Sequence, residues 1–78
     1  MKIYPNPTYG TVTVVLPAGY NISKLKVFDE AGCCVFSDNS ILAREYKMDM
    51  SRFASGSYIY QVETTDGKIY SERVVNKK

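Results

Sequence analysis

The side chains that could carry out chemistry are few in this chain of 78 residues, which has two cysteines and no histidine. Without histidine, the chain lacks the usual general base near neutral pH and the commonest metal ligand. Cys33 and Cys34 are adjacent, and no other cysteine or histidine could complete the four ligands of a structural zinc site. These residue types argue against most enzyme classes and predict neither a metal nor a cofactor.

The two cysteines are also poorly placed for a disulfide with each other, because neighbouring residues of a strand point to opposite faces. We expect one inert thiol that faces inward and one exposed thiol. A redox or metal-binding pair at Cys33 and Cys34 is the alternative.

Carboxylates are the remaining catalytic ingredient, and they fall where turns are predicted. Asp29 and Glu30 precede a glycine turn, Asp49 stands at a capping position, and Asp66 is followed directly by glycine. Aspartate is common at such places because its side chain bonds local backbone amides. No Gly-rich phosphate loop and no Ser, His and Asp set can be assembled. We interpret these carboxylates as structural.

Seven tyrosines and three phenylalanines could form a stacking platform for sugar rings or single-stranded bases. Some fall where a core needs volume: Phe53, Tyr58 and Tyr60. Others lie near turns and are candidates for an exposed aromatic surface: Tyr4, Tyr9 and Tyr20. This surface supports one alternative function, a glycan- or protein-binding β-sandwich module of a surface enzyme. The absence of Trp counts against the glycan version, because Trp is the strongest stacking side chain.

The composition is that of one small globular domain, with 45% hydrophobic and 23% charged residues. The net charge of +2 comes from interspersed charges, so no basic face indicates a nucleic-acid partner. No run approaches the roughly 20 apolar residues of a membrane helix, and residues 1–5 lack the apolar stretch of a signal peptide. The chain is therefore expected to be cytoplasmic or to be the end of a longer exported protein.

Short alternating runs separated by turns predict an all-β fold, a small antiparallel immunoglobulin-like β-sandwich of about seven strands. Extended strands are predicted for five segments, with the residues that share one face in parentheses: residues 11–16 (Val12, Val14, Leu16), 24–29 (Leu25, Val27), 33–36, 44–50 (Tyr46, Met48, Met50) and 58–64 (Tyr58, Tyr60, Val62). Residues 68–75 form the return strand, and its mixed alternation predicts a β-bulge.

The connections carry ordinary turn signals. Gly32 is expected at a positive φ, and residues 66–67 (Asp-Gly) form a hairpin turn. Asp49 or Ser51 caps a single helical turn, which lets Phe53 reach the core. Residues 5–7 (Pro-Asn-Pro) are interpreted as a rigid lead-in that seals the first strand against the sandwich. Edge strands with Lys24, Lys26 or Arg73 would discourage aggregation, and self-association through an edge strand remains an expectation.

The order of these motifs resembles one family, the C-terminal sorting domain of cargo proteins of the type IX secretion system (Por secretion system). Residues 3–10 (IYPNPTYG) and the valine strand after them resemble its opening motif, and residues 27–32 (VFDEAG) resemble its hairpin. Residues 49–58 (DMSRFASGSY) and the final strand with its basic end, residues 66–78, are similar to its last elements. The resemblance covers nearly all of the chain. Cys33 departs from the pattern, in which Lys or Arg follows the glycine.

The resemblance implies that residues 1–78 are a single sorting domain at the end of a longer cargo, whose own signal peptide leads to the periplasm. It implies a non-catalytic secretion signal in bacteria of the Bacteroidetes type, with the cell surface or the medium as destination. The implied partners are the outer-membrane translocon, its shuttle protein and a sortase that removes the domain and often joins the cargo to lipopolysaccharide. No nucleic acid and no direct membrane insertion are expected.

Such a signal must work on unrelated cargoes, so we expect it to reside in a rigid surface and an accessible chain end. We expect a receptor to recognise the domain by strand addition at the final strand, with electrostatic steering by the terminal lysines. Recognition is assigned to Lys68, Arg73, Val74, Val75, Asn76, Lys77 and Lys78. The fold is expected to depend on Pro5, Asn6, Pro7, Gly10, Gly32, Gly56, Tyr58 and Gly67.

Overall fold

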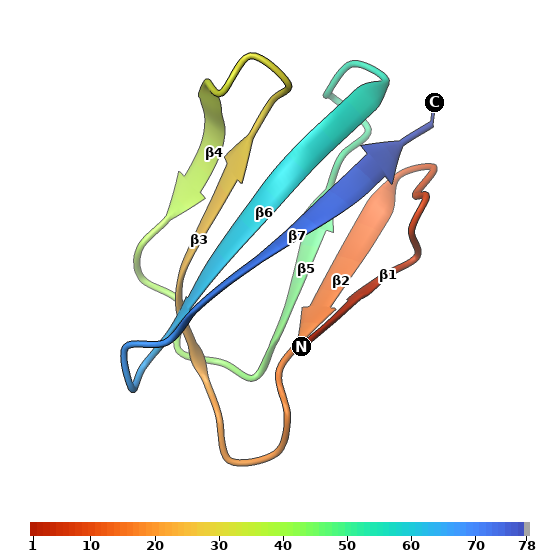
Figure 1. Ribbon diagram of the computed structural model, residues 1–78. Coiled ribbons are helices and arrows are strands. Elements are labelled where there is room, and N and C mark those ends of the chain that lie inside the picture. Colours follow the sequence, from red (N-terminus) through yellow and green to blue (C-terminus); the bar gives the residue numbers. More distant parts are fainter. Residues whose placement is uncertain (78) are drawn as a thin grey trace.

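The computed structural model describes residues 1–77, and in that range it contains seven strands and no helix (Figure 1). The strands are β1 (Lys2–Tyr4), β2 (Thr11–Val15), β3 (Ile22–Phe28), β4 (Cys34–Asp38), β5 (Glu45–Asp49), β6 (Gly56–Thr64) and β7 (Ile69–Asn76). No helix among these residues is long and apolar enough to cross a membrane. The expected all-β architecture is confirmed.

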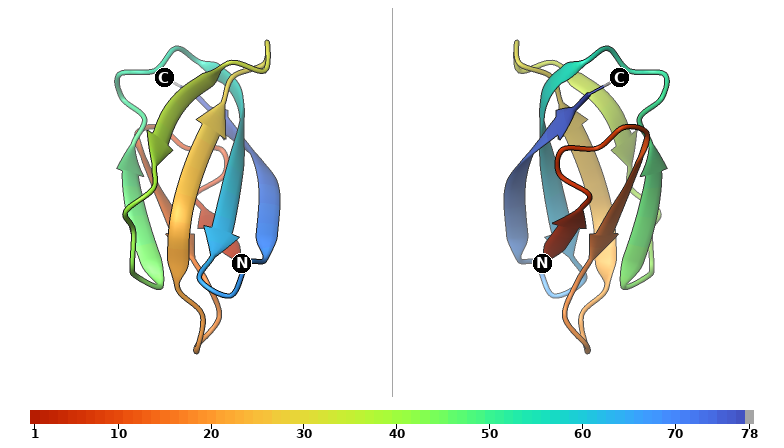
Figure 2. Two further views of the ribbon diagram at one scale, coloured as in Figure 1. Left: turned by 90° about the vertical axis from the view of Figure 1, so that its left-hand side faces the viewer. Right: turned by 90° about the vertical axis from the view of Figure 1, so that its right-hand side faces the viewer.

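The strands form two antiparallel sheets that pack face to face, as the two side views show (Figure 2). One sheet has the order β1-β2-β5 and the other the order β4-β3-β6-β7. Alternate residues of both sheets meet in the middle, because side chains along a strand point to opposite faces. The chain is therefore a small β-sandwich with β1 and β7 as the edges on one side and β5 and β4 on the other.

The core lies between the sheets and contains the side chains that the alternation predicts to face inward. Fully buried examples are Val12, Val14, Leu25, Val27, Tyr60 and Val62. The hydroxyl of Tyr60 donates to Met50 Sδ at 2.9 Å, and burial raises the pKa of this phenol above its ordinary value. Tyr46 is only partly buried, but its hydroxyl donates to Asp38 Oδ2 at 3.1 Å and so links β5 to β4 across the sandwich.

Two strand assignments differ from the expectation. β1 is absent from the sequence-based strands, because three residues before two prolines carry too little alternation to indicate a strand. β3 lies between β4 and β6, so Lys24 and Lys26 cover the outer face of a central strand and do not protect an edge. Only Arg73 of the three basic residues named for that role lies on an edge strand, β7.

The predicted bulge in the last strand is wrong. β6 and β7 pair without a register shift from Gly56↔Asn76 to Glu63↔Ile69. Val74 and Asn76 are buried on the inner face, which Glu72 shares although its side chain is exposed. Glu72 escapes burial because it lies on an edge strand, where the opposite sheet does not cover it. Irregular register occurs in β3 instead, between Ile22 and Lys24 and between Val27 and Phe28.

The expectation of one inward cysteine is also wrong, since Cys33 and Cys34 are both free and exposed. Cys33 belongs to the turn before β4, and Cys34 begins an edge strand at the end of the sandwich. Gly32 in this turn has the expected positive φ of 84°, which side-chain-bearing residues rarely adopt. Asp29 Oδ1 accepts the amides of Ala31 and Cys33, so the turn uses its carboxylate locally, as predicted.

The connector between β5 and β6 is a short turn, as expected. Asp49 Oδ1 accepts the Ser51 amide at 2.9 Å, and the Phe53 amide donates to the Met50 carbonyl. Phe53 is half-buried against the core and meets the ring of Tyr58 edge-on, with ring centroids 6.0 Å apart. The cap therefore directs an aromatic ring toward the core.

Candidate recognition surface

The residues assigned to recognition lie along one edge strand, but their side chains divide between its two faces. Lys68, Arg73 and Lys77 are exposed and Val75 is half-buried. Val74 and Asn76 are buried between the sheets, so in the folded domain their side chains present nothing to a partner. Lys78 lies outside the described residues. Strand β7 therefore combines an outer set of accessible groups with an inner set that holds the fold.

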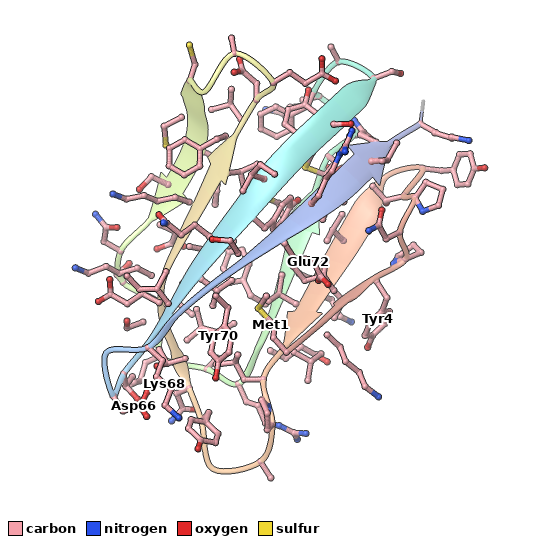
Figure 3. All side chains as sticks on the ribbon, viewed as in Figure 1. Met1, Tyr4, Asp66, Lys68, Tyr70 and Glu72 are labelled. Carbon is pink, nitrogen blue, oxygen red and sulfur yellow. The ribbon has the colours of Figure 1, made fainter. Side chains whose placement is uncertain are left out.

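Lys68 stands at the start of β7, next to the hairpin turn. Its Nζ lies 5.1 Å from the centroid of the Tyr20 ring, a cation–π contact with the loop between β2 and β3. Interactions with Tyr20, Tyr70 and Asp66, in that order, raise the pKa of Lys68 above its ordinary value. Figure 3 shows Lys68 near Asp66 and Tyr70 at this end of the strand.

Asn76 anchors the other end of β7 from the inside. Its Nδ2 donates to the carbonyls of Met50, Phe53 and Ala54 at 3.2–3.3 Å. Its Oδ1 is buried and has no partner among the described residues. A buried amide needs hydrogen-bond partners, and the Asn76 Nδ2 finds them in these three carbonyls of the connector. Asn76 is therefore a structural residue that ties the connector to the last strand.

The Pro-Asn-Pro segment, expected to seal the first strand against the sandwich, bonds to the last strand. Asn6 Nδ2 donates to the Arg73 carbonyl at 2.9 Å, and Asn6 Oδ1 accepts the Val75 amide at 3.0 Å. Two residues further on, the Thr8 amide donates to the Val75 carbonyl and the Thr8 carbonyl accepts the Lys77 amide, both at 2.8 Å. We call residues 5–8 the strap.

The strap pairs with β7 in the pattern of a parallel β-ladder, although its two prolines cannot donate backbone hydrogen bonds. Thr8 bonds to the residues on either side of Asn76, which is ordinary parallel pairing. Asn6 bonds in the same way to the residues on either side of Val74, but through its side-chain amide. Pro5 and Pro7 have no backbone N–H. The amide of Asn6 thus supplies the donor and the acceptor that the main chain between two prolines does not offer.

Replacing Asn6 by Ala removes both of these bonds and is expected to lower the free energy of unfolding by about 1–2 kcal/mol. The local effect is sharper, because the Val75 amide loses its acceptor and should exchange its proton faster. The Lys77 amide, held by Thr8, is the internal control and should keep its exchange rate. Amide exchange followed by NMR measures both. Equal acceleration at Val75 and Lys77 would contradict a separate role for Asn6.

Between the hairpin turn and the strap, the outer edge of β7 has no neighbouring strand in the described part of the chain. The outward backbone groups of Arg73, Val75 and Lys77 bond to the strap, so by alternation those of Ile69 and Ser71 point to the same side. No strand within residues 1–77 pairs with β7 there. Figure 3 shows Tyr70 and Glu72 extending from β7 toward the side where β1 and Met1 lie. The open edge and this inner face border the same side of the sandwich.

The other residues assigned to the fold occupy turns or the core. Gly56 and Gly67, like Gly32, have positive φ angles, and a Cβ on Gly56 would lie 3.4 Å from Glu30 Oε1, which accepts the Ser57 amide. Tyr58 is buried and donates to the Ala54 carbonyl. Gly10 has no positive φ and no close neighbour, so nothing in the structure explains a need for glycine there.

The exposed aromatic residues do not assemble into a platform. Tyr9 is 74% exposed and lies before the start of β2, whereas Tyr20 follows its end and is half-buried. Tyr4 is exposed on β1. Within residues 1–77, no group of three or more His, Cys, Asp or Glu side chains could hold a metal ion.

Comparison with known proteins places this arrangement in a family. Residues 2–77 match the family model described as the secretion system C-terminal sorting domain. The chain is 32% identical over 75 residues to ulvan lyase NLR42 of Nonlabens ulvanivorans, an alignment that covers 94% of this chain and 14% of that protein. The chain thus spans about one seventh of the length of this relative. It belongs to the family of secretion system C-terminal sorting domains, the sorting signals of type IX secretion.

Proposed function

We propose that this chain is the non-catalytic export signal of a longer cargo protein, which crosses the periplasm before the outer-membrane translocon accepts it. Type IX secretion delivers its cargo to the cell surface or the extracellular space, and the chain is one of its sorting domains. The proposal rests chiefly on the extent of the match, which takes in all seven strands. The lack of histidine agrees with a domain that does no catalysis.

We assign recognition to the accessible groups of the last strand: Lys68, Arg73, Val75, Lys77 and Lys78. Their partners are the translocon and its outer-membrane shuttle protein. Val74 and Asn76, which belong to the same set, act from the inside by fixing the strand on which these groups stand. The strap, the connector and the glycine turns hold that strand rigid, which suits a signal that must be recognised on unrelated cargoes. A sortase then separates the domain from its cargo.

A fusion tests this function. The chain is placed behind a periplasmic signal peptide and a fluorescent reporter in a bacterium that has the type IX system, and the same fusion is placed in a strain that lacks the translocon. We expect the reporter on the surface or in the medium only in the first strain. Release of a fragment the size of the reporter would support removal by a sortase. Reporter held in the periplasm of both strains would contradict the proposal, and binding of the isolated domain to polysaccharide would then favour the accessory module.

A further inference from the structure

Strand β7 is an edge strand whose outer side is covered by the strap over only part of its length. Exposed strand edges pair readily with other strands, and proteins usually cover or charge them. The strap covers β7 from Arg73 to Lys77 and stops there. The stretch Ile69–Arg73 is left uncovered between the strap and the hairpin turn, except for the Arg73 carbonyl, which accepts the Asn6 amide. Ile69 in this stretch is 59% exposed.

This stretch has the length and the free backbone groups needed to pair with one extended strand. Five residues are an ordinary strand length. The strap already shows that this edge accepts ladder bonds, because Asn6 and Thr8 occupy two successive positions of a parallel ladder on it. The groups that would continue this ladder are those of Ser71 and its neighbours, and they point to the same side.

The side chains on either side of the open edge indicate the chemistry of the occupant. On the outer face, the exposed Ile69 offers an apolar side chain in a small hollow that it shares with Lys24, Lys26, Gln61 and Glu63. On the inner face, the exposed carboxylate of Glu72 makes no ion pair within residues 1–77. An incoming strand that matches both would carry an aliphatic side chain over Ile69 and a basic side chain toward Glu72.

We propose that the edge Ile69–Arg73 accepts an extended strand of the export machinery, with an aliphatic residue on its outer face and a basic residue on its inner face. The proposal rests on the proposed function and adds Ile69, Ser71 and Glu72 to the recognition surface. Asn6 marks the end of the docking edge, because the strap fills the ladder beyond it. A partner strand that entered further would have to displace Asn6.

Ser71→Pro is the direct test. Proline removes the outward amide of Ser71 and places a ring on the edge. The backbone groups of Arg73, Val75 and Lys77 point outward, so by alternation the hydrogen bonds of β7 to β6 come from its even-numbered residues. We expect export of the reporter fusion to fall about tenfold. Ser71→Ala, which keeps the amide, is the matched control and should export like the unchanged fusion. Equal export of both variants would overturn the proposal and leave the proposed function intact.

A second pair of variants keeps the test decisive should Ser71→Pro fail to fold, which a thermal melt of each purified domain would reveal. Glu72→Lys reverses the charge of an exposed side chain that makes no ion pair within residues 1–77, and we expect export to fall about threefold to tenfold. Glu72→Gln should have a smaller effect. Export that is unchanged by Glu72→Lys would count against the assigned chemistry. Failure of the unchanged fusion to be exported would instead contradict the proposed function itself.

Discussion

Removal of residues 74–78 is expected to abolish the cooperative unfolding transition of the domain. The deletion takes away Val74 and Asn76, both buried, and with them the three bonds of the Asn76 amide to the connector. Full burial of a valine contributes about 1.5–3 kcal/mol, and each hydrogen bond that is lost about 0.5–1.5 kcal/mol. A domain of this size has a stability near the lower end of the usual range of about 5–15 kcal/mol. Circular dichroism during heating measures the transition.

The matched control is a chain that ends at Asn76. It loses Lys77 and Lys78, and among the described contacts only the bond from the Lys77 amide to Thr8. We expect this shorter chain to remain folded. A five-residue deletion that melts at the temperature of the full chain would contradict the structural role of Val74 and Asn76. It follows that loss of export after the long deletion would not by itself locate recognition at the chain end.

Replacing Tyr60 by Ala is the point substitution with the largest expected cost, about 3–5 kcal/mol of the free energy of unfolding. Tyr60 is the largest fully buried side chain, and it lies in the central part of the sandwich, where its hydroxyl reaches the sulfur of Met50. Truncation leaves a cavity that two thin sheets cannot fill by small shifts. Urea unfolding of both proteins gives the difference.

Tyr60→Phe separates the ring from the hydroxyl. A thioether sulfur is a weak acceptor, so the loss of the hydroxyl contacts with Met48 Sδ and Met50 Sδ should cost about 1 kcal/mol or less. The ring volume should therefore account for most of the effect of Ala. A cost for Phe as large as the cost for Ala would show that the contact between the hydroxyl and sulfur outweighs the packing of the ring.

Alternation and turn chemistry were sufficient to predict most of the sandwich. Val12, Val14, Leu25, Val27 and Tyr60 face inward as expected, because one face of each strand must be apolar to be buried. The order of strands within the sheets could not be predicted in the same way. Lys24 and Lys26 look the same in sequence on an edge strand and on the outer face of a central one. Local pattern carries no information on which strands are neighbours.

The positions of the residues assigned to recognition and to the fold were predicted only in part, and the strap accounts for much of the difference. The rigidity of Pro5, Asn6 and Pro7 follows from the sequence, but the partner of Asn6 is 67 to 69 residues away. Contacts over such separations depend on the complete topology. Glu72 was part of a conflicting pattern that suggested a bulge. Its position on an edge strand resolves that conflict, because an inward-facing residue there can still reach solvent.

The central claim is that the sorting signal is a surface of the folded last strand, and export of a charge-reversed variant tests it most directly. One variant of the reporter fusion carries Glu in place of Lys68, Arg73 and Lys77 together. The melting temperature of the purified variant domain is measured as well. All three side chains are exposed, so the domain should stay folded. We predict a folded variant whose reporter remains in the periplasm. A folded variant that is exported as well as the unchanged fusion would contradict the claim.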